Sequence, residues 1–210
     1  MIKKSTTISI IACMGLTLFI FGIVHSANYI WLTVRNNRGF DYSEYVNNER
    51  LTWTGPKAGE KIDLRNFHNQ EGQDIPIHKD KLIVLGFASS KCWMCPVSND
   101  LFEYVKDNSL KNGIDYFLVS LGTNETSEEF FLYAGELNLT SQSYIWKENK
   151  NDINVNLQNI VVPSHILVNQ DGIVLRRFPG SARDNEKRKQ MANQTVYEIL
   201  EEKEKIATNN

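Results

Sequence analysis

The chain has 210 residues, of which 41% are hydrophobic and 23% are charged, and its formal net charge is −2 at pH 7. A chain of this length and composition suits one globular domain with appended segments. The small negative charge argues against nucleic acid as a partner, because nucleic-acid-binding domains carry clustered positive charge. Three cysteines are too few for a disulfide-rich scaffold.

Residues 1–34 are predicted to be a transmembrane signal anchor. After a short basic start no charged residue occurs until Arg35, and residues 8–24 are almost wholly apolar. With its flanking residues this run is long enough to span a bilayer. Two aromatic residues, Tyr29 and Trp31, follow where an interfacial belt would lie. The sequence therefore predicts a single-pass protein of the cell membrane.

Two other interpretations of this segment remain open. A cleaved signal peptide has a shorter apolar core and a small-residue cleavage site, for which residues 24–27 are a mediocre match. A lipoprotein signal would use Cys13, but the apolar run continues well past it. We favour the uncleaved anchor, whose usual arrangement places the C-terminal domain outside the cytoplasm, where disulfides persist.

The rest of the chain divides into a tether (35–58), a folded domain (59–206) and a frayed tail (207–210). Apolar runs and alternation predict strands, helical apolar spacing predicts helices, and turn residues separate them. The predicted strands are 61–67, 75–77, 82–88, 114–121, 160–168 and 173–178. The predicted helices follow the third strand to about residue 110, run from 126 to about 134, and begin after Ser181, with fraying from Glu201 onwards. This order favours an α/β layer fold with a mixed sheet.

Cys92 and Cys95 lie at the predicted junction between the strand 82–88 and the helix that follows it. Cysteines at this spacing in a first helical turn share one face and can close a small disulfide ring. The helix N-terminus favours the thiolate, which is the form that attacks a disulfide. The pair is therefore predicted to be a redox-active dithiol.

Other roles for two cysteines at this spacing are weaker. A structural zinc site needs four ligands, and neither Cys13 nor the four histidines supplies a second pair at ligand spacing. Haem attachment needs a histidine directly after the second cysteine, where Pro96 stands. A purely structural disulfide in so small a loop constrains the unfolded chain little. We therefore expect no metal and no cofactor beyond the Cys92–Cys95 disulfide.

Three motifs, in order, resemble those of the thioredoxin fold, and more closely the membrane-anchored TlpA/ResA-like thiol-disulfide oxidoreductases of bacteria. The likeness covers about residues 55–200. Residues 55–64 resemble the entry segment of that group, residues 87–95 its Phe-Trp-Ala-x-Trp-Cys-x-x-Cys block, and residues 162–172 its cis-proline strand and hairpin. The resemblance implies a thioredoxin-like fold, with a central mixed sheet flanked by helices.

The resemblance also implies roles for four residues. Cys92 would be the exposed nucleophile, and Cys95 would be the resolving thiol deeper in the fold. Pro163 would be a cis-proline beside the disulfide, and the backbone of Val162 would pair with an extended segment of the substrate. Without the cysteines, an ordinary trans proline at a strand start would be the better interpretation of Pro163.

The sequence departs from the family pattern around the cysteines. Lys91 stands where the family usually has Trp, and its charge is expected to favour the Cys92 thiolate. Trp93 and Met94 form an unusually bulky pair that is expected to tune the redox potential. Pro96 prefers the first position of a helix, which would leave Cys92 before the helix and weaken its activation by the helix dipole.

A further departure concerns the acid that thioredoxins bury beside their cysteines to assist proton transfer. Gly86 occupies that position in this sequence. No replacement is evident, because Glu125, Glu128 and Glu129 are more typical of a solvated helix face.

The leading hypothesis is a membrane-tethered, extracytoplasmic enzyme that exchanges the thiols and disulfides of protein substrates through Cys92 and Cys95. The resemblance favours the reductive direction, as in cytochrome maturation, with a membrane electron donor or acceptor as partner. The potential of the pair decides the direction.

Two alternatives come from other families. A copper-binding module like the Sco proteins would use His165 as a third ligand, although those proteins space their cysteines by three residues and a buried strand histidine is the commoner interpretation. A peroxiredoxin-like peroxidase would use Ser89 before Cys92, but the Pro and Arg that complete such sites are not evident.

Overall fold

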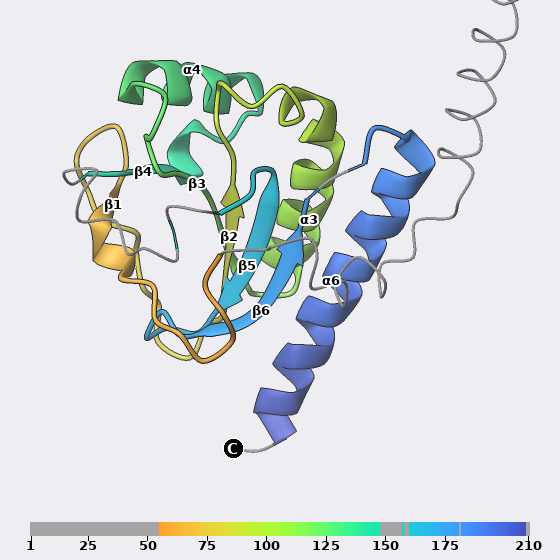
Figure 1. The fold of residues 1–210 in the computed structure, drawn as a ribbon. Helices are drawn as coiled ribbons and strands as arrows, with labels where there is room; N and C mark the ends of the chain where they lie inside the picture. Colours follow the sequence, from red (N-terminus) through yellow and green to blue (C-terminus); the bar gives the residue numbers. More distant parts are fainter. Residues whose placement is uncertain (1–54, 148–156, 158–159, 181, 209–210) are drawn as a thin grey trace, which may run out of the picture. The chain divides into compact units, whose positions relative to one another are not determined.

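A mixed β-sheet forms the centre of the part of the chain that the structure describes (Figure 1). The computed structural model describes residues 55–147, 157, 160–180 and 182–208. Within them the sheet has six strands in the order β1-β4-β3-β2-β5-β6. The strands are β1 (Phe67–His68), β2 (Ile83–Phe87), β3 (Asp115–Ser120), β4 (Ser143–Trp146), β5 (Ser164–Val168) and β6 (Val174–Pro179).

The middle of the sheet is parallel and its flanks are antiparallel. β2 pairs with β3, and β3 with β4, in parallel. β5 runs antiparallel to both β2 and β6, and β1 is antiparallel to β4. Every residue of β2 and β3 is buried, as expected for strands that are covered on both faces. The predicted α/β fold with a mixed sheet is thus confirmed, and the loops after β2 and β3 leave the same edge of the sheet.

The helices of the described residues cover this sheet. They are α3 (Asn99–Lys111), α4 (Ser127–Glu136) and α6 (Asn185–Thr208), together with the short 3₁₀ turns η1 (Leu64–Asn66), η2 (Pro96–Ser98) and η3 (Thr140–Gln142). α3 and α6 pack side by side (Figure 1). α4 begins with a capping box, in which Thr126 and Glu129 each accept a hydrogen bond from the backbone N–H of the other.

Side chains of the strands alternate between two cores on opposite faces of the sheet. Leu85 and Phe87 of β2 belong to one hydrophobic cluster, so Gly86 between them faces the other side. On that side His165 of β5 packs against Phe102 of α3, with ring centroids 5.1 Å apart. The face that carries Gly86 and His165 is therefore the face that α3 covers.

The first two predicted strands differ from the structure. The predicted strand 61–67 exists only as β1 at its end, because Asp63 caps the 3₁₀ turn η1 that precedes it. The predicted strand 75–77 is wrong: Ile75 is buried, but no strand forms there. An apolar side chain that a loop buries produces the same short sequence pattern as a strand.

Two further differences concern β4 and the end of α6. No strand is predicted at the position of β4, which lies between β3 and β1. α6 stays helical to Thr208, whereas fraying is predicted from Glu201. An ion pair between Lys205 and Glu201, 2.9 Å long and one helical turn apart, supports this last part of the helix. The predicted cap at Ser181 lies outside the described residues.

The predicted anchor (1–34) and most of the predicted tether (35–58) also lie outside the described residues. Among the residues that are described, none of the helices combines the length and the apolar character needed to cross a bilayer.

Candidate active site

The two cysteines lie in the loop that leaves the carboxyl end of β2. This loop stays close to the sheet, since the Ala88 N–H donates to the carbonyl of Val119 on β3. Two successive turns then carry the cysteines: the Cys92 N–H donates to the Ser89 carbonyl and the Cys95 N–H donates to the Cys92 carbonyl, each at 3.1 Å. Cys95 is the N-cap of η2, so Cys92 precedes the helical turn as the position of Pro96 predicts.

The thiols of the pair differ in exposure and in proton affinity. Both are free, with Cys92 half-buried and Cys95 fully buried. A hydrogen bond with the Cys95 thiol, aided by the backbone N–H groups of Met94 and Cys95, lowers the pKa of Cys92 to about 7. The same hydrogen bond and burial raise the pKa of Cys95 far above its ordinary value. At neutral pH, Cys92 is therefore the thiol that loses its proton more readily, and Cys95 holds its proton.

The predicted cis-proline lies opposite Cys92. The peptide bond between Val162 and Pro163 is cis, and β5 begins directly after it, with Ser164 opposite Phe87 of β2. The Cys92 thiol points to the Val162 carbonyl, with 3.6 Å between Sγ and the oxygen. Val162 is half-buried and Pro163 is buried, so the backbone of residue 162 borders the reactive sulfur.

The three predicted tuning residues have separate surroundings. Lys91 does not direct its charge at Cys92, because its ammonium group bonds the carboxylate of Glu129 on α4. Trp93 is 64% exposed, and the guanidinium of Arg183 lies 4.5 Å from the centre of its ring. Met94 is half-buried.

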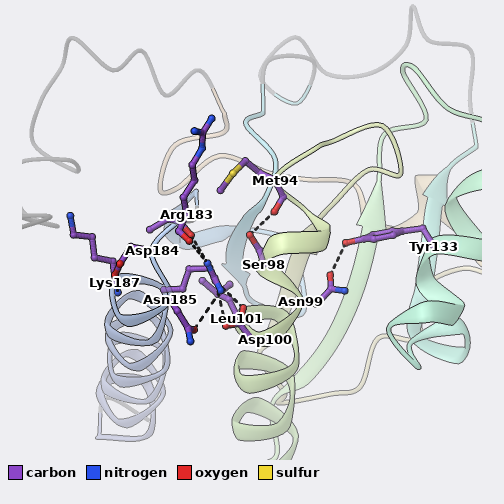
Figure 2. Close-up of polar contacts among 12 residues, drawn as sticks. Met94, Ser98, Asn99, Asp100, Leu101, Tyr133, Arg183, Asp184, Asn185 and Lys187 are labelled. Carbon is purple, nitrogen blue, oxygen red and sulfur yellow. Dashed lines mark hydrogen bonds and ion pairs between the residues drawn. The ribbon is translucent and has the colours of Figure 1, made fainter. Parts of the chain in front are cut away.

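A network of polar contacts holds the start of α3 and the loop before α6 together (Figure 2). The Ser98 hydroxyl donates to the Met94 carbonyl at 2.7 Å, which closes the turn after Cys95. Arg188 of α6 donates to the Asp100 carboxylate on α3 at 3.1 Å and to the Arg183 carbonyl at 2.7 Å. This arrangement places Arg183 beside the cysteine loop.

The prediction that Glu125 belongs to a solvated helix face is wrong. Glu125 precedes α4, is half-buried, and accepts a 2.6 Å hydrogen bond from the Ser90 N–H and another from the Ser120 hydroxyl. The sequence carries no local sign of this contact, because Glu125 lies far from the cysteines along the chain. The available signal was that the loops after two parallel neighbouring strands meet at one edge of the sheet.

Two buried side chains, Tyr116 and His165, lie beside Gly86, at the position where an acid would be expected. A Cβ atom on Gly86 would lie 2.3 Å from the hydroxyl oxygen of Tyr116. That hydroxyl lies 3.4 Å from Nε2 of His165. Burial lowers the pKa of His165 to about 3. Burial, aided by the Tyr133 hydroxyl, raises the pKa of Tyr116 well above its ordinary value, so both rings are neutral.

His165 is the predicted third ligand of the copper alternative. It is 1% exposed and contacts the rings of Phe102 and Tyr116. Within the described ranges, no three His, Cys, Asp or Glu side chains gather in a group that could hold a metal ion.

The sequence matches no protein-family profile and no curated protein. Solved structures are nevertheless similar to it. A thioredoxin domain of a thiol-disulfide oxidoreductase from Bacteroides vulgatus shares 16% identity at a TM-score of 0.51, over 69% of this chain and 99% of its own. A domain of a possible thiol-disulfide isomerase from Cytophaga hutchinsonii shares 14% at 0.53, over 74% and 99%.

A thiol:disulfide interchange protein from a Bacteroides species is a third similar structure, with 13% identity, a TM-score of 0.52, and coverage of 69% of this chain and 91% of its own. At such identities the similarity establishes the fold, which is the thioredoxin fold predicted from the three motifs.

Proposed function

We propose that this thioredoxin-fold chain is a thiol-disulfide oxidoreductase that acts on protein substrates through Cys92 and Cys95. The observation that carries the proposal is the asymmetry of the pair. A half-exposed thiol with a pKa of about 7 precedes a buried thiol that stays protonated. That division of labour is what a dithiol exchange needs.

In the reductive direction the exchange takes two steps. The Cys92 thiolate attacks the substrate disulfide, so that a bond from Cys92 to one substrate sulfur forms, the substrate disulfide breaks, and the other substrate sulfur leaves as a thiolate. Cys95 then gives up its proton and attacks Cys92, which forms the Cys92–Cys95 disulfide and releases the second substrate thiol. Two electrons pass to the substrate, and an external reductant must restore the dithiol.

The backbone at Val162 is the proposed substrate contact. An extended segment of a substrate could pair with this backbone, in the manner of strand addition, while its sulfur meets Cys92. The 3.6 Å contact between the Cys92 sulfur and the Val162 carbonyl supports this position.

The reductive direction and the membrane location extend this proposal from the sequence. Residues 1–34 would anchor the protein as a single span, and the domain would act outside the cytoplasm with a membrane electron donor or acceptor. In intact cells, a membrane-impermeant maleimide is then expected to label the wild-type chain at Cys92 and to leave the Cys92→Ser variant unlabelled. Labelling only after lysis would contradict this orientation.

The reduction potential of the pair is the decisive measurement. The full chain with Cys13→Ser, which leaves two thiols, is equilibrated in glutathione and dithiothreitol buffers, with Cys92→Ser as control. We expect one reversible two-electron transition below the glutathione potential, and reduction of a disulfide-containing test protein. A transition at strongly oxidising potentials would reverse the direction.

Absence of any reversible two-electron transition would overturn the oxidoreductase itself. Copper titration and peroxide consumption of the reduced protein would then test the other two hypotheses.

A further inference from the structure

A buried carboxylate beside the cysteines cannot come from the sheet position at residue 86. A Cβ there would meet the Tyr116 hydroxyl at 2.3 Å and the Phe102 ring at 3.4 Å. Tyr116 and Phe102 are both almost completely buried, so neither can easily move aside. Any acid that acts on the cysteine pair has to approach from another side.

Glu125 approaches from the loop between β3 and α4. Its Oε2 accepts from the Ser90 N–H at 2.6 Å, and its Oε1 accepts from the hydroxyl of Ser120, the last residue of β3. Ser90 lies one residue after Ser89, whose carbonyl closes the turn on the Cys92 N–H. The carboxylate is thereby fixed against the turn that carries the nucleophile.

The charge of Glu125 has no cationic hydrogen-bond partner in the described part of the chain. Lys91, which directly follows the Ser90 N–H donor, bonds Glu129 instead. The titratable groups that face Glu125 are the two thiols and the Tyr133 hydroxyl. Its charge works against the hydrogen bonds that lower the pKa of Cys92. It adds to the hydrogen bond and burial that raise the pKa of Cys95, and to the burial that raises the pKa of Tyr133. Because Glu125 is half-buried, this repulsion is screened less than at the surface.

We propose that Glu125 is a positioning residue that keeps the Cys92–Cys95 pair at reducing potentials, by fixing an unneutralised negative charge beside the turn that carries Cys92. This inference rests on the proposed function and deepens it. Only the reduced form can carry a thiolate. Any group that stabilises the Cys92 thiolate therefore stabilises the reduced form. It makes the pair a stronger oxidant, as in strongly oxidising dithiol proteins. A negative charge beside the thiolate does the opposite.

The test compares potentials of the full chain in the Cys13→Ser background. Glu125→Gln removes the charge and retains an oxygen that can accept from the Ser90 N–H. We expect its equilibrium with glutathione to shift about tenfold towards the reduced protein, which raises the potential by about 30 mV. The pKa of Cys92, measured from the pH dependence of its alkylation, should fall in parallel.

Two variants separate charge from structure. Glu125→Asp keeps the charge and is expected to stay nearer to the wild-type potential than Glu125→Gln does. Glu128→Gln makes the same chemical change at an exposed position in the first turn of α4 and should leave the potential unchanged. If the amide side chain prevents folding, Glu125→Ala takes its place, since it removes the charge without adding a donor opposite the Ser90 N–H.

The outcomes distinguish this inference from the proposed function. If the wild-type chain has a reversible transition and Glu125→Gln has the same potential, the role of Glu125 is wrong while the oxidoreductase stands. An equal shift in Glu128→Gln would also overturn it. If the wild-type chain has no transition at all, the proposed function fails first.

Discussion

Two pairs of neighbouring titratable side chains lie close to β2, and they differ in exposure and in charge. Cys92 and Cys95 follow the carboxyl end of the strand, with one thiol half-exposed and a pKa of about 7. Tyr116 and His165 flank the middle of the strand under α3, and both are buried and neutral. At neutral pH the first pair has one partly ionised thiol, whereas the second pair stays uncharged in the protein core.

The difference lies in what surrounds each pair. Hydrogen-bond donors favour the thiolate of Cys92. These donors are the Cys95 thiol and the backbone N–H groups of Met94 and Cys95. The Tyr116 hydroxyl contacts His165, whose ring packs against Phe102, and burial is the main cause of both pKa shifts. A titratable side chain thus becomes reactive at a sheet edge, where loops supply donors and solvent, and stays inert between the layers.

The largest expected effect comes from breaking the thiol pair. Cys95→Ala removes the main cause of the lowered pKa of Cys92, so this pKa should rise from about 7 towards its ordinary value. At pH 7 the thiolate fraction would then fall from about half to a few per cent, and the alkylation rate of Cys92 by about tenfold. Mixed disulfides with substrates should accumulate, because the resolving thiol is gone.

Alkylation rates across pH 5–10 and mass spectrometry of the trapped adducts check this prediction. Cys92→Ser is the control, since it should show no fast alkylation. A Cys95→Ala variant that is alkylated as fast as the wild type at pH 7 would mean that the second thiol does not activate the first.

A smaller effect should follow from crowding the inert pair. Gly86→Ala places a methyl group against the buried Tyr116 hydroxyl, which should lower the free energy of unfolding by about 1–3 kcal/mol. Denaturant unfolding measures the loss. The partner variant Tyr116→Phe, which removes the clashing oxygen, should restore part of it in the double mutant.

Gly135→Ala is the matched control for that substitution. Gly135 is exposed in α4 and its Cβ would make only an ordinary contact at 3.5 Å, so the variant should be neutral or more stable by up to about 1 kcal/mol. An equal decrease in the free energy of unfolding in Gly86→Ala and Gly135→Ala would contradict the tight packing around Gly86.

The smallest effect at neutral pH is expected from removing the buried imidazole. The pKa of His165 is about 3 in the folded protein and about 6.5 in an unfolded chain, so below pH 6.5 the unfolded chain binds the extra proton. Stability is therefore lost as the pH falls from about 6.5 towards about 3. Because of this group, the free energy of unfolding should fall by about 2 kcal/mol between pH 7 and pH 5. The variant His165→Leu should abolish this fall.

Unfolding of the wild type and of His165→Leu at both pH values checks the difference. The pKa of Cys92 should be the same in the two proteins, because a neutral imidazole adds no charge to the site. An identical pH dependence of stability in the two proteins would show that His165 is not held neutral by burial.

The sequence by itself determined the main strands and the residues of the candidate site. The apolar run 82–88, the cysteine pair after it, the Val162–Pro163 step and the turn at 169–172 are local patterns, and the structure places each where its pattern predicts. Local patterns suffice because strand hydrophobicity, turn residues and proline act over a few neighbouring positions.

The tertiary structure alone decided which groups meet. Lys91 bonds Glu129, Glu125 bonds Ser90, and Tyr116 fills the space beside Gly86; each contact joins segments that lie far apart in the sequence. β4 belongs here too, since its short run is recognisable as a strand only beside β3 and β1. The physical reason is that charge pairing and burial depend on distances in space, which the parallel neighbours β2 and β3 set when they bring their loops to one edge.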